Sequence, residues 1–68
     1  MQEVWIVTRD VNGKRTDHYL HWDSAYSYIQ KNVTDEDEIL LVVIEDSCIY
    51  SSLFNDPIDL VDLIGFFA

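Results

Sequence analysis

Several residue types are scarce in this sequence, and each shortage excludes a class of protein. The single cysteine, Cys48, cannot form an intramolecular disulfide, so a reducing compartment is expected. One proline and two glycines leave no Gly-rich phosphate loop, linker or low-complexity tract. No apolar run approaches the roughly 18 residues of a membrane span, and the first residues lack the basic and apolar regions of a secretion signal. We therefore expect a cytoplasmic protein without a membrane partner.

Basic residues are the scarcest charged type. Four Lys and Arg stand against thirteen Asp and Glu, which gives a net charge of −9. All four bases lie within residues 1–31, where four acids balance them, whereas residues 32–68 contain nine acids and no base. Direct binding of nucleic acid or of an anionic membrane is therefore not expected, and a basic protein is the favoured partner.

Six consecutive apolar residues at positions 39–44 stand between acidic flanks. This run predicts a central β-strand with both faces covered. The hydrophobic content of 49% is that of a globular chain, and the length suits one domain spanning residues 1–68 with one small core.

A β-hairpin is predicted at the start of the chain. Residues 3–9 are rich in β-branched and aromatic residues and predict a strand, and residues 14–22 predict its partner. Asn12-Gly13 is the preferred pair for a two-residue type I′ turn. This turn would fix the cross-strand pairs, among them Asp10 with Arg15 and Trp5 with Leu20.

Two helices are predicted beside the strands. The first is capped by Asp23 or Ser24 and ends near Asn32. Its apolar stripe faces the sheet: Ala25, Ile29 and Val33. Residues 48–52 predict a fourth strand, and Asp56-Pro57 predicts the start of the second helix. The order ββαββα defines a single small α+β domain, with a four-stranded, mainly antiparallel sheet packed by one helix plus a short C-terminal helix.

No catalytic, metal-binding or cofactor-binding motif is found. His18 and His21 are three residues apart on a predicted strand, so they point to opposite faces and cannot jointly hold a metal. Cys48 has no nearby base and is expected in the core. The acids at 35–38 lack the alternation and the glycine of a calcium loop. We expect a protein that is not an enzyme and has no cofactor.

The aromatic side chains suggest a platform on which nucleic-acid bases would stack. Such platforms normally have basic residues beside them, which this chain lacks. Most of these rings are therefore expected in the core or at its edge: Trp5, Tyr19, Trp22, Tyr26, Tyr28 and Tyr50.

The predicted partner-binding residues are the acids of the second half: Asp35, Glu36, Asp37, Glu38, Glu45, Asp46, Asp56, Asp59 and Asp62. The last three recur at intervals of three, which on a helix separates neighbouring side chains by roughly 5–6 Å. That spacing is similar to the spacing of phosphates on a nucleic-acid strand, so the acids would suit a basic groove built for DNA or RNA. Net charge that serves solubility explains the same acids about equally well.

In size, acidity, ββαββα pattern and lack of a catalytic motif, the chain resembles small phage-encoded inhibitors of bacterial defence, notably acidic anti-CRISPR proteins. Residues 35–38, 45–46 and the 56/59/62 series carry the resemblance. It implies a non-enzymatic DNA mimic in the bacterial cytoplasm. Such an inhibitor binds the basic nucleic-acid-binding surface of a defence complex, a CRISPR effector being favoured, and blocks DNA access.

Three other functions remain open. An immunity or antitoxin-type protein would cap a basic nuclease toxin with the same acids. A small homo-oligomeric structural protein would form a homodimer through the apolar C-terminus at residues 64–68. A small enzyme or metal protein is the last of the three.

Overall fold

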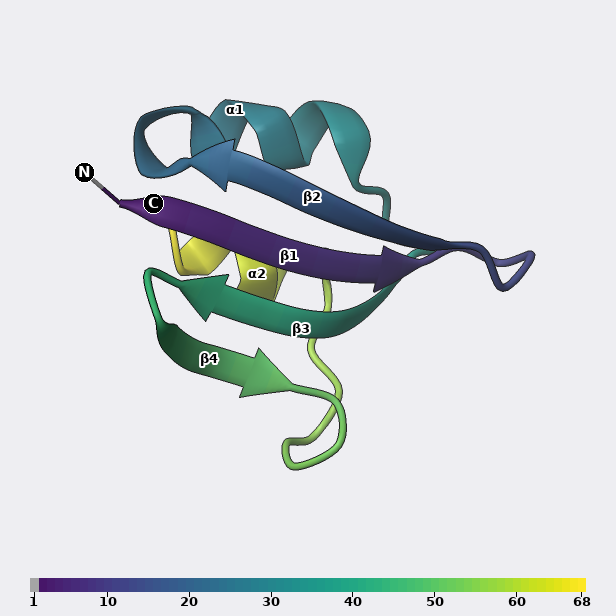
Figure 1. Cartoon of the computed structure of the whole chain (residues 1–68). Coiled ribbons are helices and arrows are strands. Elements are labelled where there is room, and N and C mark those ends of the chain that lie inside the picture. The colour runs from purple at the N-terminus through teal and green to yellow at the C-terminus, as the bar shows by residue number, and fades with distance from the viewer. Residues whose placement is uncertain (1) are drawn as a thin grey trace.

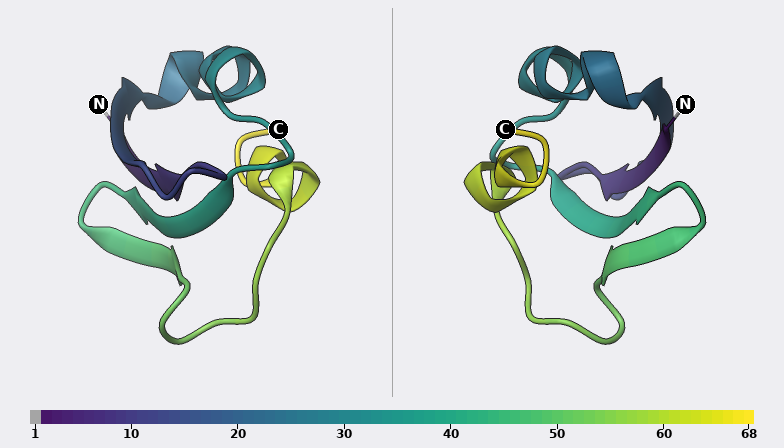
Figure 2. Two further views of the ribbon diagram at one scale, coloured as in Figure 1. Left: turned by 90° about the vertical axis from the view of Figure 1, so that its right-hand side faces the viewer. Right: turned by 90° about the vertical axis from the view of Figure 1, so that its left-hand side faces the viewer.

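The computed structural model describes residues 2–68 and confirms the predicted α+β fold. Both helices lie on one face of the sheet and leave the other face uncovered (Figures 1 and 2). Within the described residues the sheet has four antiparallel strands in the order β2-β1-β3-β4. The elements are β1 (Glu3–Arg9), β2 (Arg15–His21), α1 (Trp22–Asn32), β3 (Glu38–Ile44), β4 (Ser47–Ser51) and α2 (Leu60–Gly65).

One hydrophobic core fills the space between the sheet and the two helices. The predicted stripe on α1 is confirmed, because Ala25, Ile29 and Val33 are all buried. The C-terminus closes the core, since Phe67 is buried and its ring lies 5.1 Å from that of Trp22. β3 is an interior strand as predicted, but its second face is only half-buried because no helix covers that side.

The turn between β1 and β2 is not the predicted type I′ turn. The Gly13 N–H donates to the Asp10 carbonyl, and the Asp10 N–H donates to the Lys14 carbonyl, both at 2.9 Å. Gly13 has a φ of 85°, which completes a three-residue loop made of a type I turn and a left-handed residue. The Asp10 carboxylate stabilises this loop, since it accepts hydrogen bonds from the N–H groups of Asn12 and Lys14 at 2.9 Å.

The longer loop moves the strand register by one residue. Trp5 pairs with Tyr19 rather than with Leu20, and the predicted pairing of Asp10 with Arg15 is also wrong. A shift of one residue exchanges the two faces of a strand. Tyr19 therefore lies on the uncovered face, whereas Leu20 packs against the core.

Helix α1 begins earlier than predicted. Its N-cap is His21, whose ring accepts a hydrogen bond from the Asp23 N–H at 3.3 Å, so the predicted cap at Asp23 or Ser24 is wrong. A histidine replaces the usual Ser or Asp cap because β2 runs directly into the helix at this residue. The predicted end near Asn32 is confirmed.

Candidate partner-binding site

The predicted binding acids do not form one row. Residues 35–38 lie where α1 leads into β3, at the hairpin end of the sheet, and Glu45 and Asp46 form the turn at the other end of β3 (Figure 1). The seven residues of β3 separate these two groups by about 20 Å. The third group spans the segment before α2 and the first turn of that helix: Asp56, Asp59 and Asp62.

The predicted helix start at Asp56-Pro57 is wrong, because α2 begins at Leu60 with Asp59 as its N-cap. The Asp59 carboxylate accepts a hydrogen bond from the Asp62 N–H at 2.9 Å, and the Asp62 carboxylate accepts one from the Asp59 N–H at 3.4 Å. This reciprocal capping box satisfies two N–H groups at the start of α2. Asp59 and Asp62 therefore have a structural role, and Asp56 lies outside the helix.

Few of the acids are neutralised within the chain. Among residues 2–68, Lys and Arg form ion pairs from Arg9 to Glu38, at 2.7 Å, and from Arg15 to Asp17, at 2.8 Å. Only Glu38 of these two acids belongs to the nine of the second half, so eight of the nine have no Lys or Arg partner in the described chain.

The bases all lie at one end of the sheet, where Asp10 and the acids at 35–38 offset them. The bases gather at the hairpin end, where Arg9, Lys14 and Arg15 lie on the hairpin and Lys31 lies in the last turn of α1 (Figure 1). The opposite end carries acids from the start of β1, the first turn of α1 and the β3–β4 turn: Glu3, Asp23, Glu45 and Asp46.

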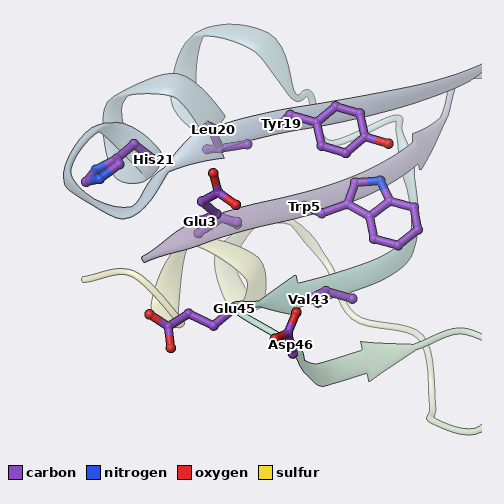
Figure 3. A pocket seen from close by; sticks show the side chains of 9 residues that line it. Glu3, Trp5, Tyr19, Leu20, His21, Val43, Glu45 and Asp46 are labelled. Carbon is purple, nitrogen blue, oxygen red and sulfur yellow. The ribbon is translucent and has the colours of Figure 1, made fainter. Parts of the chain in front are cut away.

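A groove of about 480 Å³ opens at this acidic end of the sheet. Figure 3 shows the Trp5 and Tyr19 rings beside each other on β1 and β2, with Val43 of β3 below Trp5. Leu20 also borders the groove in this view, together with four polar or charged side chains: Glu3, His21, Glu45 and Asp46. The groove thus combines an apolar, aromatic floor with three carboxylates.

The two rings stack, with centroids 6.0 Å apart and planes inclined by 6°. The Trp5 indole N–H also donates to the Asp17 carboxylate at 3.2 Å, which fixes the orientation of the indole. The hydrogen bond from Arg15 is the main reason why the pKa of Asp17 lies below its ordinary value, so this carboxylate stays charged. Tyr19 is 73% exposed and presents its ring to solvent.

The turn that carries two of the carboxylates holds an unusual backbone. Glu45 has a φ of 50°, a conformation that residues other than glycine adopt at a cost. The Glu45 N–H donates to the Glu3 carbonyl at 2.8 Å, which ties the turn to the start of β1. This contact holds the acidic turn against the strand that carries Trp5.

The two histidines point to opposite faces, as predicted. His21 borders the groove, whereas His18 is buried on the core side, with Nε2 3.0 Å from the Thr8 hydroxyl and Nδ1 2.9 Å from the Tyr28 hydroxyl. The expectation that Cys48 lies in the core is wrong, because it is exposed on β4. No group of three or more His, Cys, Asp or Glu side chains within residues 2–68 is arranged to hold a metal ion.

The groove was not predicted from the sequence, because the type I′ turn expected at Asn12-Gly13 gives the hairpin a different register. With Trp5 opposite Leu20, the aromatic pair with Tyr19 does not form, and the two rings would lie on opposite faces. The signal that indicates the correct register is Asp10, because an Asp at the start of a turn hydrogen-bonds the N–H two residues later and favours a type I turn.

Comparisons with protein-family models, with curated proteins and with solved structures find no match. No helix within residues 2–68 is both long enough and apolar enough to cross a membrane. Function must therefore be inferred from the chemistry of this chain's own surface.

Proposed function

We propose that this protein is a non-enzymatic acidic inhibitor in the cytoplasm of a bacterial host cell. It binds the basic nucleic-acid-binding surface of a defence complex, a CRISPR effector being favoured, and blocks access to DNA. The observation that carries this proposal is the uncompensated charge: eight acids of the second half have no Lys or Arg partner among the described residues, within a net charge of −9.

A basic groove that holds DNA neutralises many phosphates with Lys and Arg, and it would gain the same contacts from a fixed set of carboxylates. The acidic loops at the two ends of β3 are about 20 Å apart, which is the length of about six base pairs of duplex. Carboxylates presented on a folded sheet are preorganised, which lowers the entropic cost of binding. This arrangement of charge supports mimicry of DNA, which needs no catalytic group.

The proposal is tested with purified DNA-targeting CRISPR effectors and a fluorescent duplex, with anisotropy as the measurement. We expect the protein, added before the duplex, to reduce duplex binding, and to have little effect once the duplex is bound. Raising the salt concentration should weaken the inhibition, because screening weakens attraction between exposed charges. Inhibition that is independent of salt, or simultaneous binding of protein and duplex, would contradict the proposal.

The quadruple variant D35N/E36Q/E45Q/D46N isolates the charge. All four side chains are exposed, and none of them takes part in the capping box of α2. The variant should remain folded and lose at least tenfold in inhibitory potency, because it lacks two carboxylates at each end of β3. Unchanged potency would remove these loops from the binding surface.

One observation favours a second candidate, a homo-oligomer. Leu63 and Phe67 of the apolar C-terminus are buried in the core, but Leu53 and Phe54, in the loop after β4, are 84% and 87% exposed. Apolar side chains this exposed are typical of contact surfaces. Self-association through this loop predicts a mass that increases with concentration and that returns to the monomer mass in the L53S/F54S variant.

A further inference from the structure

We infer that the groove between Trp5, Tyr19 and the β3–β4 turn binds an arginine side chain of a basic partner protein. This inference rests on the proposed function, because it names the part of the acidic surface that makes the specific contact with that partner. The groove, rather than the 56/59/62 series, is then the centre of the interface.

The floor of the groove suits a guanidinium group. Trp5 and Tyr19 form a stacked pair, and Tyr19 is largely exposed. Guanidinium is planar and less strongly hydrated than ammonium, so it stacks on aromatic faces in a way that lysine does not. The half-buried Val43 beside the rings would contact the methylene stem of the same side chain.

The rim of the groove has the complementary charge. Glu3, Glu45 and Asp46 border the groove, and no Lys or Arg is among its lining residues. A carboxylate can pair with guanidinium through two parallel hydrogen bonds. The bases of the chain itself lie at the hairpin end, so they do not compete for these carboxylates.

The β3–β4 turn places one of these carboxylates at the edge of the groove. This two-residue turn needs a positive φ, and the chain has Glu45 there instead of glycine. A second copy of this chain is a poor occupant, since each copy carries a net charge of −9. An arginine from a basic protein satisfies both the charge and the aromatic floor.

Titration of the ¹⁵N-labelled protein with hexa-arginine and, separately, with hexa-lysine tests this inference. The largest arginine-induced shifts should occur at the Trp5 indole N–H and at the amides of Tyr19, Glu45 and Asp46. The indole of Trp22, which packs against Phe67, is an internal control that should not shift. Hexa-arginine should bind at least about fivefold more tightly than hexa-lysine, because stacking adds about 1 kcal/mol.

Two variants with matched controls locate the site. Y19S should weaken hexa-arginine binding about fivefold, whereas Y26S, on the exposed side of α1, should not change it. E45Q/D46N should weaken binding more than D35N/E36Q, although both variants lose two charges.

The possible failures are distinguishable. Shifts that concentrate at residues 35–38 or 56–62, with Y19S unchanged, would overturn the groove as the site and leave the proposed function standing. Equal affinity for the two peptides would also overturn the arginine assignment. A protein that binds neither peptide at low salt would contradict the proposed function itself.

Discussion

At the scale of single residues, Glu45 and His18 each lower the free energy of unfolding, Glu45 through its backbone and His18 through its buried ring. Glu45 keeps a carboxylate on the groove at a backbone position that favours glycine. His18 places an ionisable ring in the core, where it contacts the hydroxyls of Thr8 and Tyr28. The free energy of unfolding should therefore change when glycine replaces Glu45, and when the pH falls through the range in which His18 ionises.

Replacement of Glu45 by glycine should stabilise the domain. The substitution E45G relieves the cost of a positive φ, about 1–2 kcal/mol, and adds chain entropy to the unfolded state, so we expect a net gain of about 0.5–1 kcal/mol. Denaturant unfolding measures the change. D46G is the control and should lose stability, because Asp46 does not have a positive φ. A loss of stability in E45G would show that the turn is not strained.

Acidification should destabilise the domain through His18. Burial lowers the pKa of His18 in the folded state, partly offset by Asp37 and Asp17. Below its ordinary pKa of about 6.5 the unfolded chain therefore binds more protons than the folded one, and stability decreases as the pH falls toward the lower, folded pKa. Unfolding curves between about pH 7 and pH 5 should show this decrease in the natural sequence but not in H18Q. Parallel pH dependence in the two proteins would contradict it.

At the scale of the elements, two predictions were wrong because Asp side chains form local hydrogen bonds that the hydrophobic pattern does not indicate. The number, type and order of the elements followed from hydrophobic periodicity and turn residues, and they are confirmed. The hairpin register failed because the Asp10 carboxylate favours a longer loop, and the start of α2 failed because Asp59 and Asp62 cap each other. A single cap contributes only about 1 kcal/mol, so the residue pattern alone does not decide between two neighbouring caps or turns.

The groove also depends on these local choices. Its rings come from β1 and β2 and its carboxylates from β1 and the β3–β4 turn, so it exists only in the correct register. The acids themselves were predictable from charge segregation along the sequence. Their division between the two ends of β3 and the capping box of α2 was not predictable, because it depends on the three-dimensional course of β3 and α2.

The capping box makes a prediction about the acids of the last segment. D59A should cost about 1 kcal/mol in the free energy of unfolding, because the first turn of α2 loses a hydrogen-bond acceptor for the Asp62 N–H. D56A removes the same charge from a residue outside the helix, so it should change stability by less than about 0.5 kcal/mol. Thermal or denaturant unfolding distinguishes the two. Equal effects would mean that Asp59 is not the cap.

At the scale of the whole molecule, the charge distribution would orient the protein on the proposed basic partner. The hairpin end carries the bases together with the acids at 35–38, whereas the opposite end of the described chain has the groove with three carboxylates and no Lys or Arg. A basic surface would attract the acidic end first, which raises the association rate and sets the orientation. The longest dimension is 33 Å, so one bound molecule would cover about one turn, 34–36 Å, of a duplex path.

The measurement that tests this account most directly is retention and release of a partner. The tagged protein is immobilised and exposed to lysates of bacteria that carry CRISPR and other defence systems, and then eluted with steps of salt or with competing duplex DNA. We predict that a nucleic-acid-binding complex is retained, that duplex DNA releases it, and that D35N/E36Q/E45Q/D46N retains much less of it. A retained complex that duplex DNA cannot release, or one that the quadruple variant retains equally well, would contradict DNA mimicry by the acidic surface.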